Sequence, residues 1–149
     1  MKTLIVMLAV IIQILTLNMQ AQSSQLQNEI KTTIEALMQC SIDKDFEKAI
    51  SYWHNGDQFR FISDGESLSY EDLKHLYKDF FHNLEYIKVL ENKVTAYPLS
   101  NYKALCIWEG LEKYKMTDSE ELEPKWISSL VMENKKGKWM ILHAHTSHL

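Results

Sequence analysis

The second half of the chain carries four long segments with strand-like patterning, and these constrain the fold most. They lie at 86–97, 102–116, 125–133 and 138–146. Only short breaks separate them, and connections of this length join antiparallel neighbours. The sequence therefore predicts an antiparallel meander in the C-terminal half.

Three helical patterns precede these strands, at about 24–37, 43–53 and 69–84. The first and third begin with capping-box spacing, at Ser24–Gln27 and Ser69–Asp72. A short strand at 58–62 separates the second helix from the third, which has one wide apolar face. Helices followed by long strands predict an α+β domain with the helices packed on one face of the sheet.

Both faces of the late strands are apolar in their central parts. In the segment 102–116, for example, Ala104 and Cys106 alternate with Leu105 and Ile107. The helices can cover only one face, so the other face needs a partner, and a homodimer is the simplest one. The residues that we assign to this predicted dimer interface are Ile107, Glu109, Trp139, Ile141, His143 and His145.

The chain closes on a Gly-Lys-Trp turn at 137–139 and a His-x-His-x-Ser motif at 143–147. With the order of elements, this ending resembles the nuclear transport factor 2-like superfamily, above all its SnoaL-like branch and the association domain of calcium/calmodulin-dependent kinase II. The resemblance covers 26–147. It implies a cone-shaped α+β barrel, in which three N-terminal helices pack on a curved antiparallel sheet and leave a cavity at the open end. Because this fold hosts isomerases, dehydratases, transport factors and oligomerisation hubs, it implies no single activity.

The resemblance also implies which side chains line the cavity. They are Tyr52, Trp53, Phe61, Tyr77, Trp108, Trp126, Ser128 and Thr146. Small-molecule sites are mostly apolar with a few polar groups that fix orientation. This set therefore predicts a pocket for a small apolar molecule, although the same rings could simply fill the core.

Ketosteroid isomerase-like relatives use a tyrosine with a buried carboxylic acid, and a second carboxylate that moves the proton. In this chain Tyr52 or Tyr77 could supply the tyrosine. No Asp or Glu on the implied inner face has apolar neighbours on both sides, and the nearest, Glu112, lies close to the end of its strand. The catalytic residues are therefore left unassigned.

His143 and His145 are two residues apart, so a strand places both on one face. Zinc sites need three or four ligands, and His148 is expected in the terminal tail on the opposite face, so we predict neither a metal nor another cofactor. We expect the two histidines to form hydrogen bonds at the interface. Glu109 is expected on the same face, either exposed at its rim or paired with one of these histidines.

The N-terminus has the parts of a secretory signal: Lys2, an apolar run over 4–17, and a small residue at Ala21. The run is shorter than the roughly 20 residues of a membrane span. We predict a signal peptide at 1–21 and one exported domain at 22–149, periplasmic or secreted, with an uncleaved membrane anchor as the alternative. Cys40 and Cys106 are either free thiols near the core or a disulfide, which export permits.

The formal net charge is −4 and becomes one unit more negative without Lys2, which argues against nucleic-acid binding. No nucleophile elbow or glycine-rich phosphate loop is present. The favoured interpretation is therefore a dimeric exported domain that binds a small apolar ligand or has a structural role. The alternatives are a general acid/base isomerase or dehydratase, and an interaction module that uses the sheet face.

Overall fold

The computed structural model describes residues 2–149, with side chains described at Gln13 and from Gln20 onward. The helices are α1 (Lys2–Asp43), α2 (Phe46–Ile50) and α3 (Tyr70–Asn83). The strands are β1 (Arg60–Ser63), β2 (Glu66–Leu68), β3 (Leu84–Ser100), β4 (Lys103–Met116), β5 (Glu121–Leu122), β6 (Lys125–Lys135) and β7 (Lys138–His148). The order of helices and strands is the predicted one, with β2 and β5 as additions.

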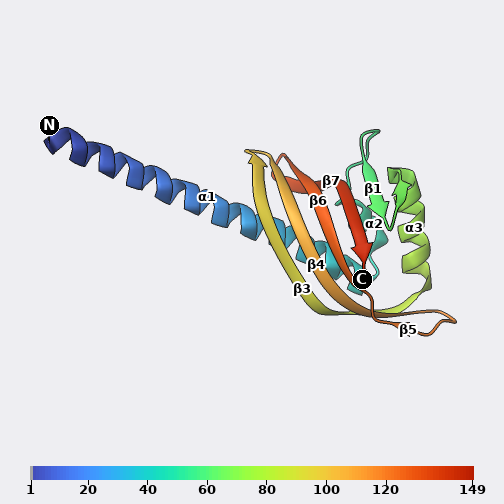
Figure 1. Ribbon diagram of the computed structural model, residues 1–149. Helices are drawn as coiled ribbons and strands as arrows, with labels where there is room; N and C mark the ends of the chain where they lie inside the picture. The colour runs from blue at the N-terminus through green and yellow to red at the C-terminus, as the bar shows by residue number, and fades with distance from the viewer. Residues whose placement is uncertain (1) are drawn as a thin grey trace.

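The strands form one curved sheet in the order β2-β1-β7-β6-β4-β3, and β5 pairs with β4. All pairs are antiparallel except β1 with β7, which run parallel. Figure 1 shows α1 crossing behind the sheet, while the ends of β3 and β4 bend beneath α3. The predicted α+β class, with helices packed on a curved sheet, is confirmed.

Helix α1 is longer than predicted. It runs without interruption through Ser24, which therefore caps no helix, and the capping box predicted at Ser24–Gln27 is wrong. Gln27 instead binds the backbone of the edge strand: its Nε2 donates to Val94 O (2.8 Å) and its Oε1 accepts from Ala96 N (2.7 Å). In the part of the chain that the structure describes, no helix has the length and hydropathy needed to cross a membrane.

The start of α3 agrees with its sequence pattern. The hydroxyl of Ser69 accepts a hydrogen bond from Asp72 N (3.2 Å), and the carboxylate of Asp72 accepts one from Ser69 N (2.9 Å). This reciprocal capping box satisfies two backbone donors at the helix start. It also fixes where α3 begins, and hence which of its side chains face the sheet.

The core lies between the helices and the inner face of the sheet. Ile30 and Ile34 of α1 are fully buried there, together with Leu130 and Met132 of β6. Both cysteines are buried as free thiols, which is the first of the two alternatives considered for them. Burial raises the pKa of Cys106 to about 12, so its thiol is unreactive at neutral pH.

A β-bulge between β6 and β7 changes which residues of β7 face inward. Val131 pairs with His143 but Met132 pairs with Ile141, so Leu142 is an extra residue in β7. Side-chain alternation shifts by one at such a bulge. Trp139 and Ile141 therefore lie in the core, 6% and 1% exposed, and their prediction as dimer-interface residues is wrong.

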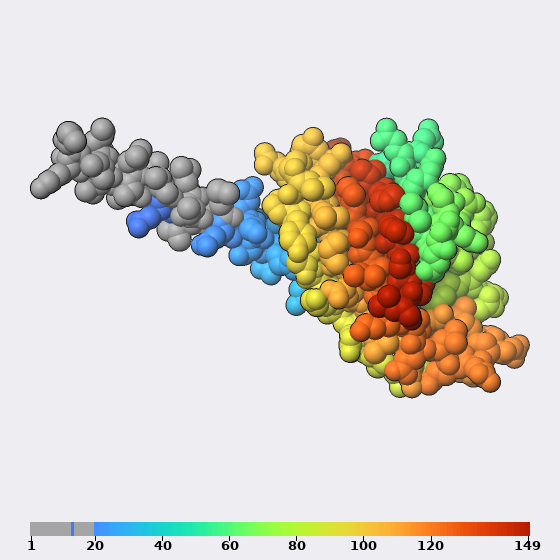
Figure 2. Space-filling view, in the orientation of Figure 1, coloured from blue at the N-terminus to red at the C-terminus, as the bar shows by residue number. Residues whose placement is uncertain are grey.

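The outer face of the sheet remains uncovered within the subunit. In Figure 2 the strands β3, β4, β6 and β7 form the front surface, and no helix lies over them. Ile107 aligns across the strands with Ser129 and His145, and Leu105 aligns with Val131 and His143. The residues predicted for the interface at this face, other than Trp139 and Ile141, do lie on it.

Candidate functional site

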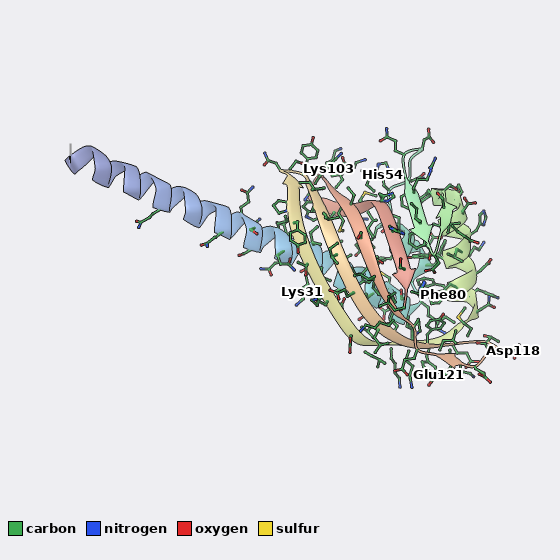
Figure 3. All side chains as sticks on the ribbon, in the orientation of Figure 1. Lys31, His54, Phe80, Lys103, Asp118 and Glu121 are labelled. Carbon is green, nitrogen blue, oxygen red and sulfur yellow. The ribbon has the colours of Figure 1, made fainter. Side chains whose placement is uncertain are left out.

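Glu112 lies on the inner face of β4. Successive side chains of a strand point to opposite faces, so Glu112 shares its face with Gly110 and Tyr114. Gly110 is buried, and the ring of Tyr114 packs against Phe80 of α3 at a centroid distance of 5.7 Å. Figure 3 shows Phe80 where α3 meets the bent ends of β3 and β4. Glu112 therefore lies on the side of the sheet that faces α3.

The carboxyl group of Glu112 is desolvated but not sealed off from solvent. Burial raises its pKa to about 7, because the charged form loses much of its hydration, and the charge of His148 opposes this shift. The residue nevertheless keeps part of its surface exposed. A carboxyl group in this state can exchange protons at neutral pH with a molecule that reaches it.

Tyr77 of α3 lies within electrostatic range of Glu112. Burial raises the pKa of the Tyr77 phenol far above its ordinary value, and the negative charge of Glu112 adds to this effect. Its ring packs edge-on against Trp53, with centroids 5.7 Å apart, and against Phe81 at 5.9 Å. Tyr77 is therefore a neutral phenol at physiological pH and can act as a hydrogen-bond donor.

The indole N–H of Trp53 points into the same region. Trp53 is 3% exposed, and its Nε1 is one of two buried side-chain atoms in the described part of the chain that have no hydrogen-bond partner. The N–H is close enough to the Tyr77 hydroxyl to lower the pKa of that phenol, although the two groups do not reach hydrogen-bond geometry. Trp53 and Tyr77 thus present two polar groups side by side in an aromatic setting.

His148 is held in place by Asp64, at the turn between β1 and β2. Asp64 Oδ2 lies 2.6 Å from His148 Nδ1, and Asp64 Oδ1 accepts a hydrogen bond from His148 N at 3.0 Å. These bonds lower the pKa of Asp64. His148 belongs to β7 and pairs with Trp126, rather than lying in a terminal tail as predicted. Asp64 therefore fixes the imidazole on the side of the sheet that Glu112 faces.

Trp126 and Trp108 cover the sheet next to Glu112. Their rings meet edge to face with centroids 4.4 Å apart, and Trp108 Nε1 donates to Asn92 Oδ1 at 2.9 Å. Trp126 occupies the space that a side chain at position 110 would need, since a Cβ on Gly110 would lie 2.3 Å from Trp126 Cζ2. Only glycine fits at this position beside Glu112.

The predicted pocket residues fall into two groups and one exception. Trp53, Phe61 and Tyr77 form one aromatic cluster, while Trp108, Trp126, Ser128 and Thr146 line the inner face of the sheet. The hydroxyls of Ser128 and Thr146 bind each other at 2.6 Å. Tyr52 lies apart, with Lys138 Nζ 5.2 Å from the centre of its ring.

Among the hollows on the surface of the described residues, two are lined by no predicted pocket residue. One of about 470 Å³ lies between α1 and the β3–β4 turn, where Trp139 Nε1 donates to Glu29 Oε2 at 2.9 Å. The other, of about 550 Å³, lies between β1–β2 and α3 and includes Asp64. A ligand cavity within the predicted set therefore stays a prediction.

On the outer face, Glu109 has a partner in its own subunit. Lys93 Nζ of β3 lies 2.6 Å from Glu109 Oε1, so the pairing proposed for Glu109 with a histidine does not occur within the subunit. His143 is half-buried and His145 is exposed. These histidines remain available to a partner that covers the face.

Comparisons with known proteins agree on the fold. Residues 30–149 match the model of the SnoaL-like domain family. A solved structure from Novosphingobium aromaticivorans, a proposed scytalone dehydratase, has a TM-score of 0.78 at 7% identity and covers 87% of this chain and 88% of its own. A proposed dehydratase of the NTF2-like family from Streptomyces avermitilis has a TM-score of 0.71 at 14% identity, with coverages of 85% and 98%.

A ketosteroid isomerase-like protein from Erwinia carotovora atroseptica is also similar. Its TM-score is 0.62 at 16% identity, and the match covers 83% of this chain and 95% of that protein. No curated protein sequence matches the chain. At these identities the solved structures show that the fold is shared, and they are not evidence for a shared activity.

Proposed function

The chain belongs to the SnoaL-like domain family, and from this premise we propose that it is an enzyme that moves protons on a small apolar molecule through Glu112. The observation that carries the proposal is the placement of Glu112 on the inner face of β4, beside Trp126 and opposite α3, with part of its surface still exposed. Burial there raises the pKa of its carboxyl group to about 7. A group that titrates near the working pH can both accept and donate a proton. This changes the preference drawn from the sequence, which favoured a non-catalytic role.

The chemistry follows from the surroundings of Glu112. In its ionised form the carboxylate takes a proton from a carbon of the substrate, and the electron pair of the C–H bond stays with the substrate. The protonated carboxyl then returns the proton to another carbon, which is isomerisation, or to a departing hydroxyl group, which is dehydration. Aromatic side chains such as Trp53, Tyr77 and Trp126 favour an apolar substrate.

Proton exchange on a carbon acid tests this role directly. In D₂O at neutral pH, the wild-type protein should accelerate the exchange of hydrogens next to the carbonyl of cyclic ketones such as 2-cyclohexenone, followed by proton NMR. Glu112→Gln should lower the rate about a hundredfold, because an amide cannot take the proton.

The matched control is Glu91→Gln, which replaces an exposed carboxylate on the neighbouring strand β3 and should leave the rate unchanged. Equal rates for the wild type and Glu112→Gln, or no acceleration of exchange by the wild type, would contradict the proposed function.

We also propose that the protein is a homodimer through its outer sheet face. Leu105 and Ile107 of β4 lie on this face with Val131 and Ile127 of β6, and Ile127 is 38% exposed; the two rows end on β7 at His143 and His145. A second copy would bury these side chains and bring its own histidines to the contact. The support is the uncovered apolar face of a sheet whose other face already carries the helices.

A charge placed on this face should separate the two subunits. Ile127→Glu is expected to convert a dimer into a monomer in sedimentation velocity, because a carboxylate would be buried without a partner. Leu76→Glu, on α3 and 50% exposed, should leave the dimer intact. A wild-type protein that sediments as a monomer at micromolar concentration would contradict the dimer.

Export remains part of this proposal. The basic start, short apolar run and small residue at Ala21 support removal of residues 1–21. The remaining domain, 22–149, contains all of the residues discussed for the site and for the dimer face. A periplasmic or secreted location would exclude the cytoplasmic and nuclear roles that this fold has elsewhere.

A further inference from the structure

The hollow between α1 and the β3–β4 turn contains one carboxylate and no basic side chain. Its volume is about 470 Å³, which is enough for a small molecule. Among the described residues that line it, Glu29 is the one acid, and none is a lysine, an arginine or a histidine. The charge that this hollow offers to a ligand is therefore negative.

The carboxylate of Glu29 is held in place by two neutral donors. Its Oε2 accepts a hydrogen bond from Trp139 Nε1 at 2.9 Å, and its Oε1 accepts one from Gln25 Nε2 at 2.8 Å. These bonds lower the pKa of Glu29, the bond from Trp139 most strongly, so the group is ionised at neutral pH. Trp139 is only 6% exposed, and it therefore anchors the carboxylate to the core.

This negative charge has no cationic partner in the subunit. The ion pairs of the described residues leave Glu29 out, although Lys31 and Glu35 pair on the same helix at 3.8 Å. Each carboxylate oxygen can accept more than one hydrogen bond. Glu29 can therefore accept further hydrogen bonds from a ligand without releasing Trp139.

The other walls of the hollow are apolar or carry neutral polar groups. Leu26, Pro98 and Leu99 supply the apolar surface, and Leu99 is 57% exposed. Asn101 and Asn134 add amide groups at the tips of the two hairpins. One fixed negative charge beside an apolar surface fits a small molecule with one positive charge and an apolar body.

We propose that this hollow binds a small primary amine, whose ammonium group pairs with Glu29 and whose apolar part lies on Leu26 and Leu99. An ammonium group has three N–H donors, and hydrogen bonds between charged groups are the stronger kind. A zinc ion would need three or four protein ligands, and no cluster of three or more His, Cys, Asp or Glu occurs in the described part of the chain. Trp139 is a positioning residue, because it acts on the ligand through Glu29.

Two probes of nearly equal shape separate recognition of the charge from apolar packing. Benzylammonium has an NH₃⁺ group where benzyl alcohol has a hydroxyl group. The wild-type protein should bind benzylammonium about tenfold more tightly at pH 7 and low salt, as measured by ligand-detected NMR titration, because one charged hydrogen bond distinguishes the probes.

Glu29→Gln should remove this preference, since the amide has nearly the same shape and no charge. Trp139→Phe should reduce the preference several-fold and leave the binding of benzyl alcohol unchanged, because the carboxylate loses its anchor while the apolar walls stay.

Two matched controls test whether any acidic part of the surface attracts the cation. Glu35→Gln removes a carboxylate from α1 outside the hollow, and Asp79→Asn removes one from the other hollow, beside α3. Both variants should keep the preference for benzylammonium. Equal loss in either control would overturn the inference. So would a wild type without preference, including the case in which the amino terminus at Gln22, left by removal of residues 1–21, occupies Glu29.

A measurement on the unmodified protein covers the case in which Trp139→Phe does not fold. The indole N–H resonance of Trp139 should shift when benzylammonium is added, because its acceptor Glu29 gains a positive partner, and it should stay unchanged with benzyl alcohol. An identical response to both probes, or none to either, would overturn the inference.

This site is separate from the one proposed around Glu112, since no residue that lines the hollow belongs to that site. Glu112→Gln should therefore lose proton exchange and keep the preference for benzylammonium. Loss of the preference in Glu112→Gln would place the amine at Glu112 and overturn the inference, whereas proton exchange that does not need Glu112 contradicts the proposed function alone.

Discussion

Glu112→Gln should make the protein more stable than the wild type at pH 8, by about 3 kcal/mol in the free energy of unfolding. The carboxyl of Glu112 has a pKa of about 7 in the folded protein, above its ordinary value of 4.5. Between these values the folded state holds a proton that the unfolded state has released. Stability therefore falls as pH rises through this window, and the loss is complete above pH 7. A neutral amide avoids that loss.

The measurement is chemical denaturation of both proteins at pH 4.5 and pH 8. Comparing variant with wild type at each pH cancels the contributions of Asp64 and Asp72, whose pKa values are lowered and whose effect on stability has the opposite sign. The advantage of the variant should be small at pH 4.5 and large at pH 8. A variant that is equally or less stable at pH 8 would show that Glu112 is not desolvated.

If Glu112→Gln stabilises the protein, this result would support a functional reason for having a glutamate at this position. Burying a carboxylate without a cationic partner costs stability, and proteins keep such groups mainly where chemistry needs them. The charge of His148, which Asp64 holds in place, only partly offsets the burial of Glu112. The wild-type protein is thus less stable than Glu112→Gln because it has the carboxyl group that the proposed reaction requires.

The sequence predicts the layers of this fold well because the signals involved are local. The capping box at Ser69 and the apolar face of α3 depend on residues within a few positions of one another. The face on which a strand residue lies is predicted from the alternation of side chains along the strand. This prediction fails where a β-bulge adds a residue to one strand. The bulge at Leu142 places Trp139 and Ile141 inside the core, although both share their sequence parity with His143 and His145.

The site was harder to predict because its key property comes from tertiary contacts. Glu112 has Leu111 and Lys113 as sequence neighbours, which gives no sign of an apolar environment. Its desolvation results from the inner face of β4 and from α3, which lies far away in sequence. A signal did exist: Glu112 has the same strand parity as Trp108 and Gly110, both of which face inward.

Gly110 shows how closely the wall beside Glu112 is packed. An added Cβ would lie 2.3 Å from Cζ2 and 2.7 Å from Cε2 of Trp126, well inside van der Waals contact. The indole cannot move freely, because Trp126 is buried and packs against Trp108. Glycine usually weakens a strand interior, and here it marks a place where a large ring approaches the backbone.

Gly110→Ala is therefore expected to destabilise the protein by about 3 kcal/mol, measured as the free energy of unfolding, because an overpacked core must shift its side chains. The double variant with Trp126→Phe tests the cause, since a smaller ring makes room for the new methyl group. It should be clearly less destabilised than the sum of the two single variants, which would show coupling between the positions. Strict additivity would mean that the contact with Trp126 does not cause the destabilisation. A Gly110→Ala protein as stable as the wild type would mean that Trp126 is free to move. In that case the wall next to Glu112 would be adaptable, and a ligand could displace the indole to reach the carboxyl group.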